Sequence, residues 1–219
     1  MTSNPPIHAV IFDMDGLLLD SERVSYACGR EACEALGLPW REETALAMIG
    51  RNARDNALLL EGLFGDPRHV DAHAAEFARR YEALIAAGAI PLKPGVTELL
   101  DLLDRLALPR AVATSTSHAR AQFKLERVGL AARMHAVIGG DQVPQGKPAP
   151  DIFLAAAARL GIAPANCLAL EDSNAGARAA LAAGMQVRMV PDLLAPDADV
   201  IAAGARIVPS LFSVIEELA

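Results

Sequence analysis

Two aspartates lie one residue apart at the end of a mostly apolar run near the N-terminus. Residues 7–12 have the composition of a buried parallel strand, and Asp13 and Asp15 follow directly. Gly16 then permits a sharp backbone turn. Two carboxylates at a strand end repel each other and lose hydration. A divalent cation is the simplest compensation, so we expect a metal site there.

Other polar side chains follow further apolar runs. We expect them to meet the aspartates, because the carboxyl ends of parallel strands share one edge of a sheet, where ligands bind. Singly, each would be interpreted as a helix cap, a turn residue or a solvated charge. These polar residues are Thr114 and Ser115 after the run 110–113, Lys147 in a loop before a predicted helix, and Glu171, Asp172 and Ser173 after the run 168–170.

Such a set of side chains favours phosphoryl chemistry. Carboxylate oxygens without a His or Cys cluster suit Mg²⁺ better than zinc. A free carboxylate can attack phosphorus and form an aspartyl phosphate, and the metal and a lysine neutralise the charge that opposes this attack. A second carboxylic acid can protonate the leaving alcohol and later deprotonate a water molecule.

Five short apolar runs alternate with helical patterns. This alternation predicts an α/β fold with a doubly wound parallel sheet. The expected strands lie at 7–13, 110–115, 135–140, 166–172 and 186–190, and the expected helices of the core at 96–107, 117–129, 149–161 and 174–183.

The segment from about residue 22 to residue 88 breaks this alternation, because it carries helical patterns and no strand signal. We predict a core of residues 1–20 and 91–219 and an inserted all-helical domain of residues 21–90. Since the insertion follows the acidic strand end directly, we expect it to act as a lid over the site. The alternative is a helical elaboration that does not move.

Composition and charge exclude several classes of protein. The 219 residues are 53% hydrophobic and carry a net charge of −7 without a basic run, so we expect no nucleic-acid partner. Cys28, Cys33 and Cys167 are too few and too scattered for a disulfide framework or zinc site. The sequence shows no signal peptide and no apolar stretch of membrane-spanning length. We expect a cytoplasmic monomer that acts on a small molecule.

Four motifs in order resemble those of the haloacid dehalogenase superfamily. Asp13-Met14-Asp15-Gly16 is similar to the first motif of its phosphatases, Thr114 to the second, Lys147 in GKPAPDIF to the third, and Glu171-Asp172 in LEDSNAG to the fourth. The resemblance covers nearly the whole chain, and the insertion resembles the small α-helical cap of subfamily I. The branch that it resembles contains beta-phosphoglucomutase and phosphatases.

The resemblance implies roles for the acidic residues. Asp13 would be the nucleophile and a Mg²⁺ ligand. Asp15 would be the general acid/base, with its backbone carbonyl on the metal. Asp172 would be the third protein ligand of the metal, and Glu171 would hold a metal-bound water or complete the acidic surroundings of the ion.

It also implies roles for residues that bind phosphate and substrate. Thr114 would bind the transferring phosphoryl group with help from the Ser115 N–H, and Lys147 would pair with Asp13 and the phosphoryl oxygens. In the cap, Arg51 and Arg54 resemble part of a substrate-facing loop, where either could clamp an anionic group. Both are equally consistent with solvated surface positions.

Several activities stay open within the superfamily. Dehalogenases lack the second aspartate, so Asp15 favours phosphoryl chemistry. Beta-phosphoglucomutase has a cap histidine where this chain has Ser25, and a lysine where it has Ser117. Phosphonate cleavage by a Schiff base requires a cap lysine, and residues 22–88 contain none. We therefore expect a Mg²⁺-dependent phosphatase acting on a small phosphorylated metabolite, such as a sugar phosphate or phosphoglycolate. A mutase and a non-catalytic phospho-ligand binding protein are the alternatives.

Overall fold

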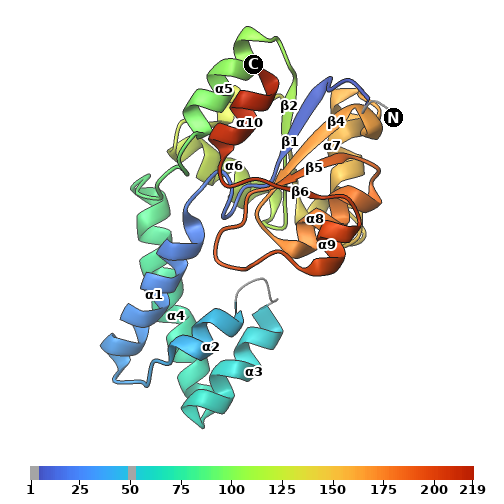
Figure 1. The fold of residues 1–219 in the computed structure, drawn as a ribbon. Helices are drawn as coiled ribbons and strands as arrows, with labels where there is room; N and C mark the ends of the chain where they lie inside the picture. Colours follow the sequence, from blue (N-terminus) through green and yellow to red (C-terminus); the bar gives the residue numbers. More distant parts are fainter. Residues whose placement is uncertain (1–4, 49–52) are drawn as a thin grey trace. The chain divides into compact units, whose positions relative to one another are not determined.

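The computed structural model describes residues 5–48 and 53–219 and contains a single parallel sheet (Figure 1). Its strand order is β3-β2-β1-β4-β5-β6, so β2 and β3 lie on one side of β1 and β4, β5 and β6 lie on the other. This order confirms the predicted α/β fold with a doubly wound sheet. The strands are β1 Ala9–Phe12, β2 Arg110–Thr114, β3 Ala136–Gly139, β4 Cys167–Glu171, β5 Gln186–Met189 and β6 Arg206–Ile207.

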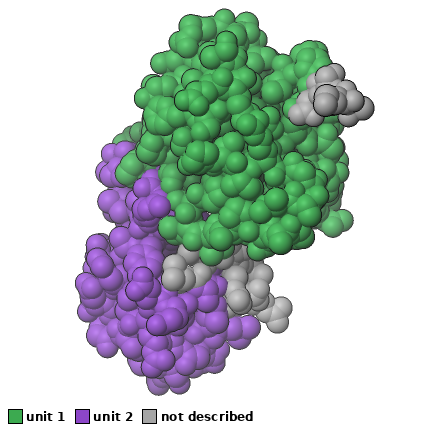
Figure 2. Space-filling view, viewed as in Figure 1, with its two compact units in different colours: residues 1–19, 91–219 green, residues 20–90 purple. Residues whose placement is uncertain are grey.

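The chain divides into two compact units (Figure 2). Unit 1 comprises residues 1–19 and 91–219, and unit 2 comprises residues 20–90. Unit 2 contains the helices α1 Ser21–Leu36, α2 Glu42–Met48, α3 Ala53–Phe64 and α4 Pro67–Ala86. Unit 1 contains the helices α5 Val96–Arg105, α6 His118–Arg127, α7 Asp151–Leu160, α8 Asn174–Ala182, α9 Ala198–Ala202 and α10 Leu211–Leu218. It also contains three short 3-10 helices at Ala131–Arg133, Gly140–Gln142 and Pro164–Asn166. No helix within the described residues is both long and apolar enough to span a membrane.

The central strand β1 is buried on both faces. All four of its residues have zero exposed surface. Ala9 and Ile11 join the apolar cluster that includes Ile152 and Phe153 of α7. Since successive side chains of a strand point to opposite faces, Val10 and Phe12 face the other layer. Burial on both faces explains why this strand reads as a continuous apolar run.

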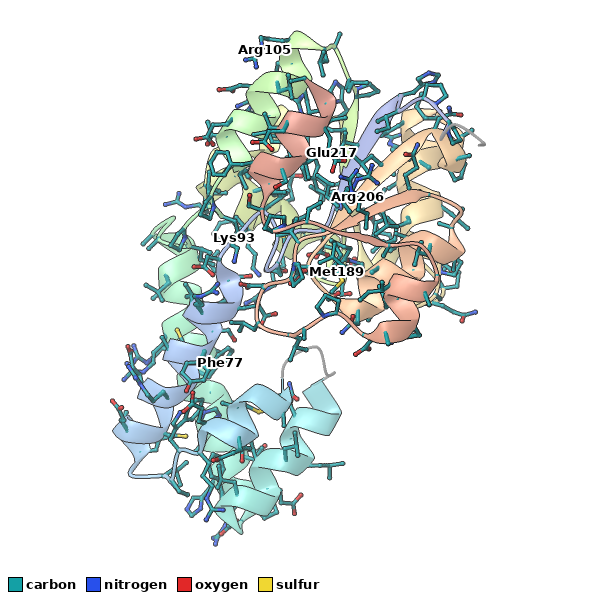
Figure 3. All side chains as sticks on the ribbon, in the orientation of Figure 1. Phe77, Lys93, Arg105, Met189, Arg206 and Glu217 are labelled. Carbon is teal, nitrogen blue, oxygen red and sulfur yellow. The ribbon has the colours of Figure 1, made fainter. Side chains whose placement is uncertain are left out.

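The C-terminal elements were not predicted. Strand β6 has only two residues, which is too short for any periodicity to be visible in the sequence. Helix α10 is held to the sheet by Glu217, which forms ion pairs with Arg188 Nε on β5 at 2.7 Å and with Arg206 Nη1 on β6 at 3.1 Å (Figure 3). These contacts join residues that are far apart in the sequence, so local patterns do not reveal them.

Unit 2 has its own packed interior. Helix α1 packs along α4, and α3 packs along α4. His73 of α4 is buried and its Nε2 lies 3.1 Å from the Gly29 carbonyl oxygen of α1. The rings of His73, Phe77 and Tyr81 follow one another along α4. The regular elements among the described residues of unit 2 are all helices.

Both chain passages between the units lie side by side within unit 1. Leu19 forms an antiparallel bridge with Leu92, and the Lys93 N–H donates to the Leu18 carbonyl at 3.0 Å. The helical insertion thus leaves and re-enters unit 1 at one place, directly after the turn that carries Asp15.

Candidate active site

Asp13 is the first residue beyond β1 and belongs to the buried edge of the sheet. Its N–H donates to the Leu170 carbonyl of β4 at 2.9 Å, which continues the β1–β4 ladder by one residue. The residue is 6% exposed, and its carboxylate Oδ1 accepts a bond from Lys147 Nζ. Strand pairing therefore fixes the backbone of Asp13, and a lysine holds its side chain.

Burial dominates the acidity of Asp13. Loss of hydration raises its pKa to about 7, with Lys147 acting in the opposite direction and the nearby charge of Glu171 raising it further. Burial alone therefore disfavours the ionised form of this carboxyl group. A divalent cation beside it would favour the ionised form, which is the nucleophilic one.

The turn after β1 brings the backbone of Gly16 against the side chain of Asp172. Gly16 has φ +93°, and a Cβ at this position would lie 2.2 Å from Asp172 Oδ2. Any side chain would therefore both strain the turn and displace the carboxylate of Asp172, which is 8% exposed. The first and fourth sequence motifs are thus in direct contact in space.

Glu171 orients Lys147. Glu171 is fully buried, and Lys147 Nζ donates a hydrogen bond to Glu171 Oε1 at 2.5 Å. The other oxygen accepts bonds from the Asp172 N–H at 3.0 Å, the Ser173 N–H at 2.9 Å and the Ser173 hydroxyl at 2.9 Å. Since both oxygens are engaged by the protein, the structure shows Glu171 as an acceptor that holds Lys147; its predicted role near a metal stays a prediction.

Lys147 is a buried cation between two carboxylates. Burial would lower its pKa, but the attraction of Asp13 and Glu171 raises the pKa above the ordinary lysine value. The lysine therefore stays charged at neutral pH. It can balance negative charge that a phosphoryl group brings to Asp13.

Thr114 ends β2 beside this cluster in the sheet. It is 1% exposed, and its Oγ1 accepts the Thr116 N–H at 3.1 Å. A hydroxyl group that accepts one hydrogen bond can still donate its own proton. Ser115, the next residue, is exposed. The β2 end therefore offers one buried hydroxyl group and an exposed turn.

Asp15 has partners that the sequence analysis did not identify. Thr116 Oγ1 donates to its Oδ2 at 2.7 Å, and Lys124 Nζ of α6 donates to its Oδ1 at 2.8 Å. One signal in the sequence could have revealed Lys124: it occupies an apolar-face position, next to Leu125 and three residues after Ala121.

The donor set fits a hard divalent cation. Asp13 and Asp172 supply carboxylates, and the Asp15 carbonyl would supply a third oxygen. Over residues 5–48 and 53–219 no group of three His, Cys, Asp or Glu side chains is placed to hold a metal. Mg²⁺ commonly uses only one or two carboxylates and fills its shell with water and substrate phosphate, so two side chains suffice.

The two cap arginines are not placed by the structure. Arg51 lies outside the described residues, and Arg54 belongs to α3 without a described side chain. Their proposed contact with substrate stays a prediction. The three cysteines are buried and free, as expected of small core residues.

A parallel sheet with a buried carboxylate, a lysine and further acids at its switch point is the arrangement expected of a phosphoryl-transfer hydrolase. Residues 7–184 match the haloacid dehalogenase-like hydrolase family. The chain belongs to this family, and within it the chain is a phosphoric monoester hydrolase.

Similar proteins include enzymes of phosphorylated sugars. Protein CbbY of Rhodobacter capsulatus is 37% identical over 212 residues, covering 92% of both chains. A phosphorylated carbohydrates phosphatase of Thermotoga maritima is 32% identical over 184 residues, covering 82% of this chain and 83% of the relative. The structure of a Rhodobacter sphaeroides CbbY mutant with xylulose-(1,5)bisphosphate is 27% identical, with a TM-score of 0.71 and coverage of 94% of this chain and 95% of that chain.

Proposed function

We propose that this protein is a Mg²⁺-dependent phosphatase of small phosphorylated carbohydrates and that it acts through a phosphorylated Asp13. The observation that supports this most directly is the placement of Asp13 itself. It is a buried carboxylate at the end of the central strand, paired with Lys147, with Asp172 held against the adjoining turn. A nucleophile, a compensating cation and a hard oxygen donor thereby share one edge of the sheet.

In the first half-reaction a carboxylate oxygen of Asp13 attacks phosphorus. The bond between phosphorus and the ester oxygen breaks, and the leaving oxygen takes a proton from Asp15. Lys147 balances the charge near Asp13, while the Thr114 hydroxyl and the Ser115 N–H bind phosphoryl oxygens. The products of this step are the alcohol and an aspartyl phosphate.

In the second half-reaction water attacks the same phosphorus. Its proton goes to the Asp15 carboxylate, its oxygen bonds to phosphorus, and the bond to Asp13 breaks with return of the electron pair to that carboxylate. The products are inorganic phosphate and the original enzyme. When bound by Asp13, Asp172 and the Asp15 carbonyl, Mg²⁺ would supply charge neutralisation for phosphoryl oxygens.

The substrate class follows from the relatives rather than from a described contact. Proteins named for phosphorylated carbohydrates and a complex with xylulose-(1,5)bisphosphate support a sugar phosphate for this chain. We propose that unit 2 carries the residues that select it, with Arg51 or Arg54 binding an anionic group of the sugar.

A substrate panel tests this proposal. Sugar monophosphates and bisphosphates, phosphoglycolate and nucleoside monophosphates are incubated with Mg²⁺ or with EDTA, and released phosphate is measured. We expect turnover with Mg²⁺, best for sugar phosphates, and a mass increase of one phosphoryl group on the Asp13 peptide after acid quench. Binding of sugar phosphates without any turnover would instead indicate a binding protein.

The same panel separates hydrolysis from mutase activity. A phosphatase releases one phosphate per sugar phosphate consumed, whereas a mutase converts glucose 1-phosphate into glucose 6-phosphate without net release. Conversion that exceeds phosphate release would overturn the hydrolase assignment.

A further inference from the structure

Lys124 is a lysine in a buried position of α6. It is 4% exposed, and the other buried residues of this helix are Ala121 and Leu125. Their spacing of three and four residues places all three on the face of α6 that packs into unit 1. Burying an ammonium group is costly unless the charge is paired. An apolar residue at this position would avoid the cost of removing a charge from water, so the presence of a lysine needs an explanation.

Its ammonium reaches Asp15. Lys124 Nζ donates to Asp15 Oδ1 at 2.8 Å, while Thr116 Oγ1 donates to Oδ2 at 2.7 Å. The two donors come from different elements and engage different oxygens. They therefore fix the position of the carboxylate and also its rotation about the bond to Cβ. The Asp15 side chain keeps 25% exposure, which leaves it accessible to a small reactant.

Lysine is rare in this chain. Only Lys93, Lys124 and Lys147 occur among 20 lysines and arginines. All three form ion pairs with aspartates of unit 1: Lys93 with Asp192, Lys124 with Asp15 and Lys147 with Asp13. Two of the three thus hold the two aspartates of the first motif. Lys93, after the return from unit 2 (Figure 3), pairs with Asp192 instead and provides a matched control.

We propose that Lys124 is a positioning residue that, with Thr116, holds the Asp15 carboxylate in the orientation that accepts a proton from the attacking water. This inference rests on the proposed function. Breakdown of phosphorylated Asp13 requires Asp15 to accept a proton from water, whereas formation with a good leaving group such as para-nitrophenolate needs little proton donation. Lys124 therefore acts on the breakdown of phosphorylated Asp13 more than on its formation.

The test measures both half-reactions. Wild type, Lys124→Met and the control Lys93→Met are mixed with para-nitrophenyl phosphate and Mg²⁺, quenched in acid, and the phosphorylated Asp13 peptide is quantified by mass spectrometry. In Lys124→Met we expect phosphorylated Asp13 to accumulate and to decay about 10–100-fold more slowly, part of the effect typical of general base catalysis. In Lys93→Met we expect the ratio of the two rates to match wild type.

A second pair of variants covers the case in which Lys124→Met does not fold. Thr116→Val removes the hydroxyl donor at nearly constant volume, and Thr116→Ser retains a hydroxyl group. We expect slower breakdown of the phosphorylated enzyme in Thr116→Val and recovery of most of the wild-type rate in Thr116→Ser. Combining Lys124→Met with Asp15→Asn should add little to the effect of Asp15→Asn alone, because both act through one carboxylate.

Three results would overturn the inference. Equal slowing of formation and breakdown in Lys124→Met would indicate a merely structural role. If Lys124→Met slowed breakdown just as much in the Asp15→Asn background, Lys124 would act through a residue other than Asp15. Unaltered breakdown in both Lys124→Met and Thr116→Val would exclude positioning. Failure of the proposed function is distinguishable, since wild type would then form no phosphorylated Asp13 at all.

Discussion

At the scale of single residues, two aspartates of the same motif have different surroundings. Asp13 is nearly fully buried and pairs with Lys147, whereas Asp15 remains partly exposed and is held by Lys124 and Thr116. Identical side chains in different environments take on different chemical roles. Covalent attack suits the buried residue, and proton transfer to a passing reactant suits the accessible one.

Asp13→Asn should therefore abolish turnover and leave the fold intact. The amide keeps the shape of the side chain but is a poor nucleophile, and Lys147 keeps Glu171 as a charge partner. We expect at least about a thousandfold loss of kcat, as in other enzymes that lose a covalent nucleophile. Phosphate release measures the turnover of the variant, and thermal melting followed by circular dichroism measures the stability of its fold. Turnover comparable to wild type would remove Asp13 as the nucleophile.

At the scale of elements, the turn between β4 and α8 is built around a close approach. A Cβ at Gly176 would lie 1.7 Å from Glu171 Oε1. This glycine lets the first turn of α8 lie against the carboxylate that holds Lys147. The fourth motif thus combines a backbone requirement with a chemical one.

Gly176→Ala should accordingly lower both stability and activity. The added methyl group must displace a buried carboxylate, so we expect destabilisation of about 1–3 kcal/mol, typical of overpacking. Gly62→Ala in α3 is the matched control, because nothing lies within 4 Å of its Cβ position. There alanine should be neutral or stabilising by up to about 1 kcal/mol. Equal urea denaturation midpoints for both variants would contradict the packing argument.

Helix α4 carries an acid-sensitive charge cluster. Hydrogen bonds from Arg79 lower the pKa of Glu76 to about 2, with burial opposing them and Arg80 adding to them. A lowered pKa means that the ionised form stabilises unit 2 above the ordinary glutamate pKa of about 4.3, and that this contribution is lost as the pH falls toward about 2.

Glu76→Gln should lower the melting temperature at pH 7 and approach wild type as the pH falls below about 3. Asp71→Asn, at an exposed position of the same helix, serves as the control. Thermal melts followed by circular dichroism from pH 2 to pH 7 give the comparison. A difference from wild type that does not shrink in acid would assign the effect to packing instead of charge.

At the scale of the whole molecule, the switch point of the sheet gathers the site. Strands β1, β2 and β4 are neighbours although β2 and β4 lie about a hundred or more residues beyond β1 in the chain. Their carboxyl ends bring Asp13, Thr114 and Glu171 to one edge. Asp13, Glu171 and Asp172 formally carry three negative charges, against the single positive charge of Lys147 in this group. A bound cation would offset that excess.

Removal of metal should therefore affect both activity and stability. We expect EDTA to abolish turnover and added Mg²⁺ to restore it. Mg²⁺ at about 100 times its dissociation constant should stabilise the fold by about 2.7 kcal/mol. Calorimetric melts with Mg²⁺, with EDTA and with NaCl at equal ionic strength separate specific binding from screening. Asp172→Asn should weaken the Mg²⁺ effect. Full turnover after thorough chelation would contradict a metal-dependent mechanism.

Local patterns along the chain were enough to predict the fold class and to single out the residues of the four motifs. Buried strands and amphipathic helices have local periodicities, so the five main strands and the core helices α5 to α8 were predictable from the local sequence pattern. The order of those strands along the chain also placed Asp13, Thr114 and Asp172 at one edge. Short terminal elements such as β6 left no readable pattern.

The ion pairs and hydrogen bonds of the charged residues at that edge became visible in the three-dimensional structure alone. Lys124 reaches Asp15 across 109 residues of sequence, and Glu171 turns both oxygens toward donors of the protein. Such pairings depend on which face of a helix packs inward and on how closely two turns approach. Local periodicity carries no information on these distances, because they arise only when segments remote in the chain are packed together.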